Sequence, residues 1–273
     1  MKMSYHYSEI EALAAATLGQ HLNKKWHVER EGRILASSMR DTIELGHDLQ
    51  HHILKKGAKL SEDLLQKIRW RRKCLYNYKD FSSRPAVSWG LQKESLARAC
   101  YEKQTGYRVE ETGLWVFPSG SVCCSPDGLV FTSQESKHPE GILEIKCPYK
   151  LRNGQVIPSD KWARLFPYLK SDFKLNQEHR LYQLIQAELY ATRTNWCDLF
   201  LWTPTQTLLV RVQRNEQFIQ TNVPLVDWVF ENYIYPLCRK DDRKKFRFRE
   251  LENRDWQYRE EVYLKRKGKN DIL

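Results

Sequence analysis

The sequence predicts a single α/β domain with a mainly helical N-terminal part. Helix patterns dominate the first 80 residues, and β-like runs occur between residues 108 and 214. A strong helix pattern over residues 178–193 separates the earlier β-like runs from the later pair. No internal repeat or linker divides the 273 residues, so one domain accommodates the whole pattern.

The N-terminal part is expected to hold four helical segments. Ser8 is placed to cap the first, whose Ala- and Leu-rich run covers residues 8–22. A second is expected around residues 34–39. Amphipathic stretches at 43–54 and 61–78, separated by KKGAK, predict two more.

The middle of the chain predicts one helix and then a small sheet. A turn at SSRP precedes a helix over residues 89–106, which Gly106 ends. Three β-like runs follow at 108–118, 121–131 and 141–148, separated by turn residues. We expect these runs to pair with one another.

The last third predicts a helix, a strand pair and a final helix. The strands are CDLFLWT and TLLVRVQR, which flank Pro204, and the final helix is clearest over residues 222–238. The expected organisation is one domain over residues 1–238, followed by a basic tail. Its parts are a helical N-terminal part (1–80), a core (81–213), a C-terminal helix (215–238) and the tail (239–273), which has 13 Lys/Arg and 8 Asp/Glu.

Composition excludes some functional classes. No apolar run approaches the roughly 20 residues of a membrane span. The net charge of +11 and the pI of about 9.2 indicate a polyanionic partner such as nucleic acid. Seven cysteines, with Cys123 and Cys124 adjacent, favour reduced thiols over a disulfide framework. We therefore expect an intracellular protein of the cytoplasm or nucleus.

The segment from Ser125 to Cys147 has the pattern of a catalytic site. Asp127 lies in a Pro-Asp-Gly turn, and Glu144 and Lys146 alternate along an apolar run. The period of a strand places these two side chains on one face. Carboxylate oxygens bind Mg²⁺, and a neighbouring ammonium stabilises charge that develops on a phosphate. A surface Glu-x-Lys pair is common, but the preceding Pro-Asp-Gly turn favours a site.

These residues resemble the PD-(D/E)xK nuclease motif. The similarity extends to the YqaJ-type viral recombinase family, which includes lambda-type phage exonucleases. Four segments occur in the family's order: WGLQKE (89–94), SPDG (125–128), LEIKCP (143–148) and YQLIQ (182–186). The resemblance implies a restriction-endonuclease-like core, in which a central mixed β-sheet is flanked by helices.

The resemblance also implies roles for individual residues. Glu94, Asp127 and Glu144 would bind metal, and Lys146 would lie at the attacking water. Gln183 would lie beside the site and complete the catalytic set. The implied cofactor is Mg²⁺ or Mn²⁺, as two ions.

The helix pattern over residues 178–193 carries a polar stripe. Gln183, Gln186 and Tyr190 share one side of such a helix, opposite its apolar residues. Either a face turned toward a site or a solvated face explains this stripe.

A segment near the N-terminus, WHVEREGRILASS, is similar to the family's W-x-x-x-R-x-G-R-[IL]-T-A-S element. The resemblance implies that Arg30, Ser37 and Ser125 bind the terminal 5′ phosphate of DNA. Guanidinium and hydroxyl donors suit phosphate oxygens. Leu35 replaces the usual Thr in this element.

The implied function is a metal-dependent deoxyribonuclease. It would act as a 5′-to-3′ exonuclease on linear duplex DNA and supply single strands for recombination or annealing. Double-stranded DNA ends are the implied partner, with a single-strand annealing protein and a homotrimer as further candidates and no membrane. The alternatives are an endonuclease or alkaline-nuclease-like DNA/RNA processing enzyme of the same fold, and a non-catalytic DNA-binding scaffold.

Overall fold

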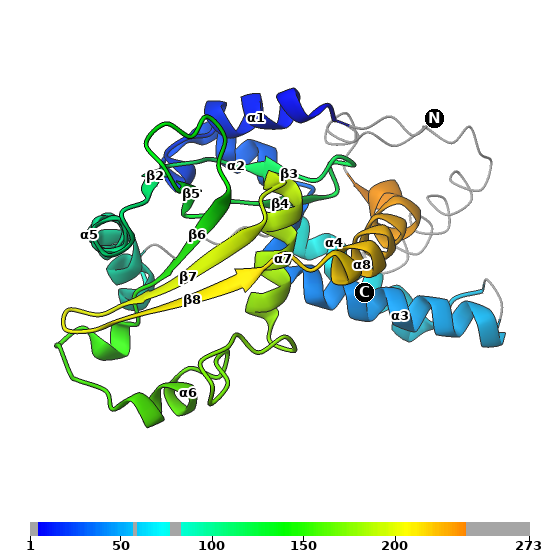
Figure 1. Ribbon diagram of the computed structural model, residues 1–273. Helices are drawn as coiled ribbons and strands as arrows, with labels where there is room; N and C mark the ends of the chain where they lie inside the picture. Colours follow the sequence, from blue (N-terminus) through cyan, green and yellow to red (C-terminus); the bar gives the residue numbers. More distant parts are fainter. Residues whose placement is uncertain (1–4, 57–58, 77–82, 239–273) are drawn as a thin grey trace.

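The computed structural model describes residues 5–56, 59–76 and 83–238 and contains two β-sheets with helices around them (Figure 1). The expected basic tail lies outside the described residues. The strands are β1 Ile34–Leu35, β2 Arg108–Glu110, β3 Trp115–Val116, β4 Val122–Cys124, β5 Gly128–Phe131, β6 Gly141–Lys146, β7 Trp196–Trp202 and β8 Thr207–Gln213. The helices are α1 Tyr7–Ala16, α2 Lys24–Arg30, α3 Met39–Lys56, α4 Glu62–Tyr76, α5 Pro85–Thr105, α6 Trp162–Leu165, α7 Arg180–Thr192 and α8 Glu216–Val229.

The larger sheet is mixed and has the strand order β2-β5-β6-β7-β8. Its central strand, β6, is antiparallel to β5 and parallel to β7, and β8 pairs antiparallel with β7. Helices α5 and α7 both contact β6. The predicted α/β fold with a mixed sheet flanked by helices is confirmed.

The two faces of β6 belong to different cores. Ile142 packs in a cluster with apolar residues of α7, such as Ile185 and Leu189. Leu143 and Ile145 pack in another cluster that includes residues of α5. Successive strand side chains point to opposite faces, so Glu144 and Lys146 lie on the α7 side of the sheet, as the period of the run predicts.

A buried ion pair fixes α5 against the larger sheet. Asp198 of β7 is fully buried and accepts a hydrogen bond from the Tyr101 hydroxyl of α5 at 2.7 Å. Arg211 of β8 donates to both Asp198 oxygens at 2.8 Å. The carboxylate is therefore fully engaged, which a buried charge requires. Pro85 begins α5, and Gly106 ends it in the left-handed conformation, as expected from the sequence.

The smaller sheet, ordered β1-β4-β3, differs from the sequence prediction. Ile34 and Leu35 were expected in a helical segment, but they form β1, which pairs in parallel with Val122 and Cys123 of β4. The Ile34 N–H donates to the Ser121 carbonyl at 2.8 Å. This pairing joins segments far apart in sequence, so local helical propensity does not decide the conformation.

The three expected β-like runs are also divided between the two sheets. The first run breaks into β2 and β3, and the second into β4 and β5. Turn residues interrupt both runs, namely Thr112 and Gly113 in the first and the SPDG segment in the second. These interruptions let each run leave one sheet and enter the other.

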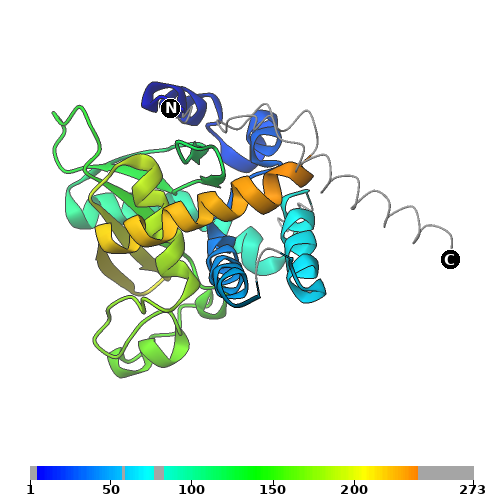
Figure 2. The same ribbon diagram turned by 90° about the vertical axis from the view of Figure 1, so that its right-hand side faces the viewer.

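The remaining helices follow the predicted segments with shifted ends. The first expected helix ends early because Gly19 adopts a left-handed conformation before a short 3₁₀ turn at residues 20–22. The strand pair and the helix over 178–193 occur as β7, β8 and α7. Helix α8 continues as helical turns through Leu237 and contacts α3, as Figure 2 shows. None of the described helices is both long and apolar enough for a membrane span.

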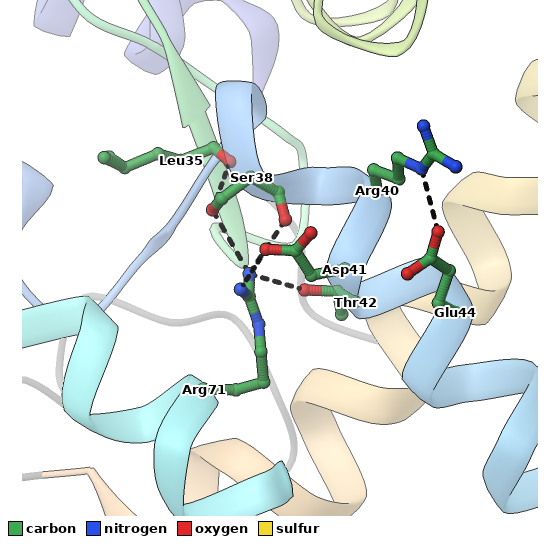
Figure 3. A network of polar contacts seen from close by, with 7 residues as sticks. All are labelled: Leu35, Ser38, Arg40, Asp41, Thr42, Glu44 and Arg71. Atoms are coloured by element: carbon green, nitrogen blue, oxygen red, sulfur yellow. Dashed lines mark hydrogen bonds and ion pairs between the residues drawn. The ribbon is translucent and has the colours of Figure 1, made fainter. Parts of the chain in front are cut away.

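Arg71 joins α4 to the first turn of α3 and to the residue before it (Figure 3). Its guanidinium donates to Asp41 at 2.7 Å, to the Ser38 carbonyl at 2.8 Å and to the Thr42 hydroxyl at 3.2 Å. The Ser38 hydroxyl in turn donates to the Leu35 carbonyl at 3.0 Å. Helix α4 therefore supports the backbone from residue 35 to residue 42.

We expect Arg71→Ala to lower the free energy of unfolding by about 2 to 3 kcal/mol, since several hydrogen bonds of a buried guanidinium are lost. Urea unfolding followed by circular dichroism measures this change. Arg69→Ala is the matched control on the same helix, because its ion pair with Glu62 lies at the surface. That control should change stability by no more than about 0.5 kcal/mol. Equal effects of the two substitutions would contradict the supporting role of Arg71.

Candidate active site

A cavity of about 210 Å³ lies between the N-terminal part and the larger sheet. Its walls come from α2, the segment around Leu35, the β4–β5 connection, β6 and α7. Five of the predicted site residues line it together: Arg30, Ser37, Ser125, Asp127 and Glu144. The three residues expected to bind phosphate thus share one cavity with two of the three expected to bind metal, Asp127 and Glu144.

Asp127 is held by the main chain of β6. Its N–H donates to the Leu143 carbonyl at 3.1 Å, and its Oδ2 accepts a hydrogen bond from the Ile145 N–H at 2.6 Å. Gly128, next in the chain, approaches β2 so closely that a Cβ would lie 2.4 Å from Val109. The Pro-Asp-Gly turn therefore places the Asp127 carboxylate directly beside β6.

Glu144 and Lys146 form an ion pair on the α7 side of β6. The Glu144 side chain is 6% exposed, whereas that of Lys146 is 36% exposed. Burial opposes the charged ammonium, but the carboxylates of Glu144 and Asp127 outweigh it and raise the pKa of Lys146 above its ordinary value. Lys146 therefore carries its charge beside Glu144, although its own side chain does not line the cavity.

Glu94 approaches the same carboxylates from α5 but does not line the cavity. Arg98, one turn along, donates to it at 3.0 Å and also pairs with Glu111. Burial raises the pKa of Glu94, and the Glu144 charge adds to this rise while Arg98 opposes it. Glu94 thus interacts electrostatically with the site while an arginine holds its side chain.

Helix α7 presents residues to the cavity that differ from those expected. Leu184 and Glu188, one turn apart, line it, whereas Gln183 does not. A helical residue five positions from another lies about 140° around the axis, so Gln183 and Glu188 occupy different faces. The Gln183 Oε1 is buried and, among the described residues, has no hydrogen-bond partner, so its role beside the site stays a prediction.

The polar stripe on α7 is structural rather than solvated or turned toward the site. Gln186 is fully buried, donates to the Gln213 carbonyl at 2.9 Å and accepts from the Asn215 N–H at 2.7 Å. Tyr190 packs edge-on against Phe117, with ring centroids 4.7 Å apart. A solvated face therefore does not explain Gln186, and neither residue lines the cavity.

Sequence reasoning missed Glu188. Its side chain is 1% exposed, and its Oε2 has no hydrogen-bond partner among the residues that the structure describes. Burial raises its pKa well above the usual value, and the charges of Glu144 and Asp127 raise it further. The only signal in the sequence is a Glu among the apolar positions of an amphipathic helix.

Carboxylate repulsion is the main electrostatic feature of the cavity. Burial raises the pKa of Asp127 well above its usual value, with Glu144 and Glu94 adding to the rise and Lys146 opposing it. A single ammonium group faces several carboxylates, so a bound divalent cation would relieve their repulsion.

The phosphate-binding candidates are positioned by Trp26, a second residue that sequence reasoning passed over. The Arg30 guanidinium stacks on the Trp26 ring at 3.8 Å from its centroid. The Trp26 Nε1–H donates to the Ser125 hydroxyl oxygen at 2.9 Å, which leaves the Ser125 hydrogen free to donate elsewhere. Trp26 therefore orients one guanidinium and one hydroxyl toward the same cavity.

The donor set fits a hard divalent cation. Asp127, Glu144 and Glu188 could supply oxygen ligands, and the unpartnered Glu188 oxygen is the type of buried atom that a cation would satisfy. The other carboxylates already have partners: Asp127 accepts from the Ile145 N–H, Glu94 pairs with Arg98, and Glu144 pairs with Lys146. In the described ranges no three His, Cys, Asp or Glu side chains converge as a preformed metal cluster. The ion pair with Lys146 uses Oε1 of Glu144, and the Ile145 N–H bonds Oδ2 of Asp127, so each carboxylate has a second oxygen that could face an ion.

Comparisons with known proteins agree with this architecture. The family model of the YqaJ-like viral recombinase domain matches residues 25–164, just over half of the chain. An alkaline exonuclease (LHK-Exo) from Laribacter hongkongensis has a similar structure, with a TM-score of 0.52 and 20% identity, covering 77% of this chain and 92% of its own. Its complex with dAMP gives a TM-score of 0.52 at 21% identity and the same coverage.

A phage-related exonuclease from Haemophilus somnus 129PT is also similar, with a TM-score of 0.50 and 13% identity, covering 74% of this chain and 93% of its own. No curated protein matches the chain significantly. At these identities the structural likeness demonstrates a shared fold. The family resemblance inferred from the sequence motifs is confirmed by the family match.

Proposed function

The chain belongs to the YqaJ-like viral recombinase domain family, and on this premise we propose that it is a metal-dependent deoxyribonuclease. In this proposal it degrades one strand of linear duplex DNA from a 5′ end. The observation that carries the proposal is the shared cavity, in which Arg30, Ser37 and Ser125 lie with Asp127 and Glu144. Phosphodiester hydrolysis needs hydrogen-bond donors that hold the phosphate, next to carboxylates that can hold a metal ion.

The proposed cofactor is two ions of Mg²⁺ or Mn²⁺. Asp127, Glu144 and, from α5, Glu94 would hold them. When bound, they would neutralise the phosphodiester and stabilise the charge that develops during hydrolysis. Lys146 pairs with Glu144, and its raised pKa keeps the ammonium group protonated. Its ammonium would orient an attacking water or stabilise the developing negative charge.

The polarity of the proposed reaction comes from the phosphate side of the cavity. A terminal phosphate has three free oxygens and more charge than an internal phosphodiester, so one guanidinium and two hydroxyls match it better. Stacking on Trp26 restricts the Arg30 guanidinium and lowers the entropy that binding costs. These features support a 5′-phosphorylated DNA end as the substrate.

Family membership supports a role in recombination. The strand that is left unpaired when the other is degraded would pass to an annealing partner. A homotrimer would hold the DNA between successive cleavages. Both expectations rest on the family resemblance of the motifs.

Removal of the cation tests the reaction class. Excess chelator should abolish nuclease activity, and Asp127→Asn or Glu144→Gln should lower kcat by about a thousandfold or more, since each removes an oxygen ligand. Both variants should retain their circular dichroism spectrum. Asp172→Asn, at an exposed ion pair, is the control and should retain activity. Full activity of the wild type in chelator would exclude the proposal.

Lys146→Ala tests the role of the ammonium. We expect kcat to fall on the order of a hundredfold with little change in DNA affinity, because the interaction strengthens in the transition state. Single-turnover cleavage and fluorescence anisotropy measure the two quantities. Lys174→Ala, an exposed lysine, should change neither. Weaker binding with an unchanged single-turnover rate would make Lys146 an ordinary phosphate contact.

Arg30→Ala tests polarity. The wild type should cut a linear duplex with a 5′ phosphate faster than the same duplex with a 5′ hydroxyl, and the variant should lose this preference while it retains metal-dependent cleavage. End-labelled duplexes and a closed circular duplex serve as substrates, and Lys25→Ala, exposed on the same helix, is the control. Equal wild-type rates on both ends, or rapid cutting of the circle, would instead support an endonuclease.

A further inference from the structure

Glu188 occupies a position where an apolar residue would be expected. Its neighbours on α7, Ile185 and Leu189, pack fully buried against the larger sheet, and Ala187 and Ala191 belong to the core beside the smaller sheet. Glu188 lies between these two apolar faces and is itself 1% exposed. The helix therefore carries a carboxylate into the interior at the single turn that lines the cavity.

This carboxylate has no internal counter-charge of its own. Within the described part of the chain its Oε2 accepts no hydrogen bond, and Lys146, whose charge acts on it, is already paired with Glu144. A buried carboxylate without a partner is costly, and a leucine or glutamine at this position would avoid the cost. Packing therefore does not account for the residue type.

We propose that Glu188 is a further oxygen ligand of the cation at Asp127 and Glu144, supplied from the α7 side of the cavity. Both of those residues also line the cavity, so the three carboxylates line one space from the β4–β5 connection, β6 and α7. The ligand is a hard divalent cation, for which carboxylate oxygens are the preferred donors. This inference rests on the proposed function and adds a residue outside the four motifs of the sequence.

The position of Glu188 gives it a distinct part in cation binding. Asp127 and Glu144 are each engaged by a β6 N–H or by Lys146, whereas the Glu188 Oε2 is unengaged in the described structure. Glu188 therefore offers an oxygen to an incoming ion without giving up another contact. The ion would, in turn, supply the partner that the buried carboxylate lacks.

The test measures cation binding directly on the full chain, without DNA. Glu188→Gln keeps the shape of the side chain, and we expect it to raise the Kd for Mn²⁺ at least about tenfold by calorimetry. Its Tm without cation should rise by about 2 °C or more, because a buried unpartnered charge is removed. Glu178→Gln, an exposed carboxylate just before α7, is the matched control and should change neither quantity.

Luminescence of bound Tb³⁺ separates ligation from a remote charge effect. Lifetimes in H₂O and D₂O count the water molecules on the ion, and Glu188→Gln should raise that number by about one or two as water replaces the lost carboxylate. An unchanged number of waters would overturn the proposal even if affinity fell. A lower Tm with unchanged Mn²⁺ affinity would also overturn it and make Glu188 a structural residue.

Asp127→Asn distinguishes failure of this inference from failure of the proposed function. If the wild type binds Mn²⁺ and Asp127→Asn does not, while Glu188→Gln binds like the wild type, only the role of Glu188 is wrong. If the wild type neither binds Mn²⁺ nor cleaves DNA, the proposed function itself is wrong.

Discussion

Two hydrogen bonds join Asp127 to the main chain of β6, one from its own N–H to Leu143 and one to its carboxylate from Ile145. They set the position at which β5 begins and place the Asp127 side chain beside Glu144. The register of β6 is therefore critical, because a slip of one residue would turn Glu144 and Lys146 toward the α5 core. Apolar cores on both faces of β6 make such a slip costly, since it would also move Ile145 out of its packing.

The electrostatics of the cavity oppose the stability of the fold. Asp127, Glu144 and Glu188 line one cavity, and burial, with repulsion from neighbouring carboxylates added, raises the pKa values of Asp127 and Glu188 while Lys146 opposes the rise. Asp198, by contrast, is buried with Tyr101 and Arg211 fully engaged around it. The same chain thus satisfies one buried carboxylate completely and leaves others incompletely compensated. Strongly perturbed groups gathered in one cavity are typical of functional sites.

The sequence predicts structure well where residue periodicity or interactions between residues close in the chain decide the conformation. Alternation along β6 predicts that Glu144 and Lys146 share a face, and helix patterns locate α3, α4, α5 and α7. The pairing of Ile34 with β4 could not be predicted, because it depends on a contact between segments nearly ninety residues apart. Glu188 was missed for a related reason: on an amphipathic helix, only the fold reveals which polar residue turns inward. The motif match selected Gln183, whereas the face of α7 at the cavity holds Leu184 and Glu188.

The cavity combines two parts of the chain that hydrogen bonds join, since Trp26 of α2 donates to Ser125 and Gln20 donates to the Pro126 carbonyl, next to Asp127. The sheet and α7 supply the carboxylates, whereas residues around α2 and β1 supply the phosphate side. Arg33, buried beside the latter segment, donates to the Gly120 carbonyl at 2.6 Å and to the Glu29 carbonyl at 2.8 Å, and Arg71 supports it from α4. The two walls therefore meet at the β4–β5 connection, where Ser125 and Asp127 lie two residues apart. Function must accordingly be argued from both walls of the cavity rather than from the fold alone.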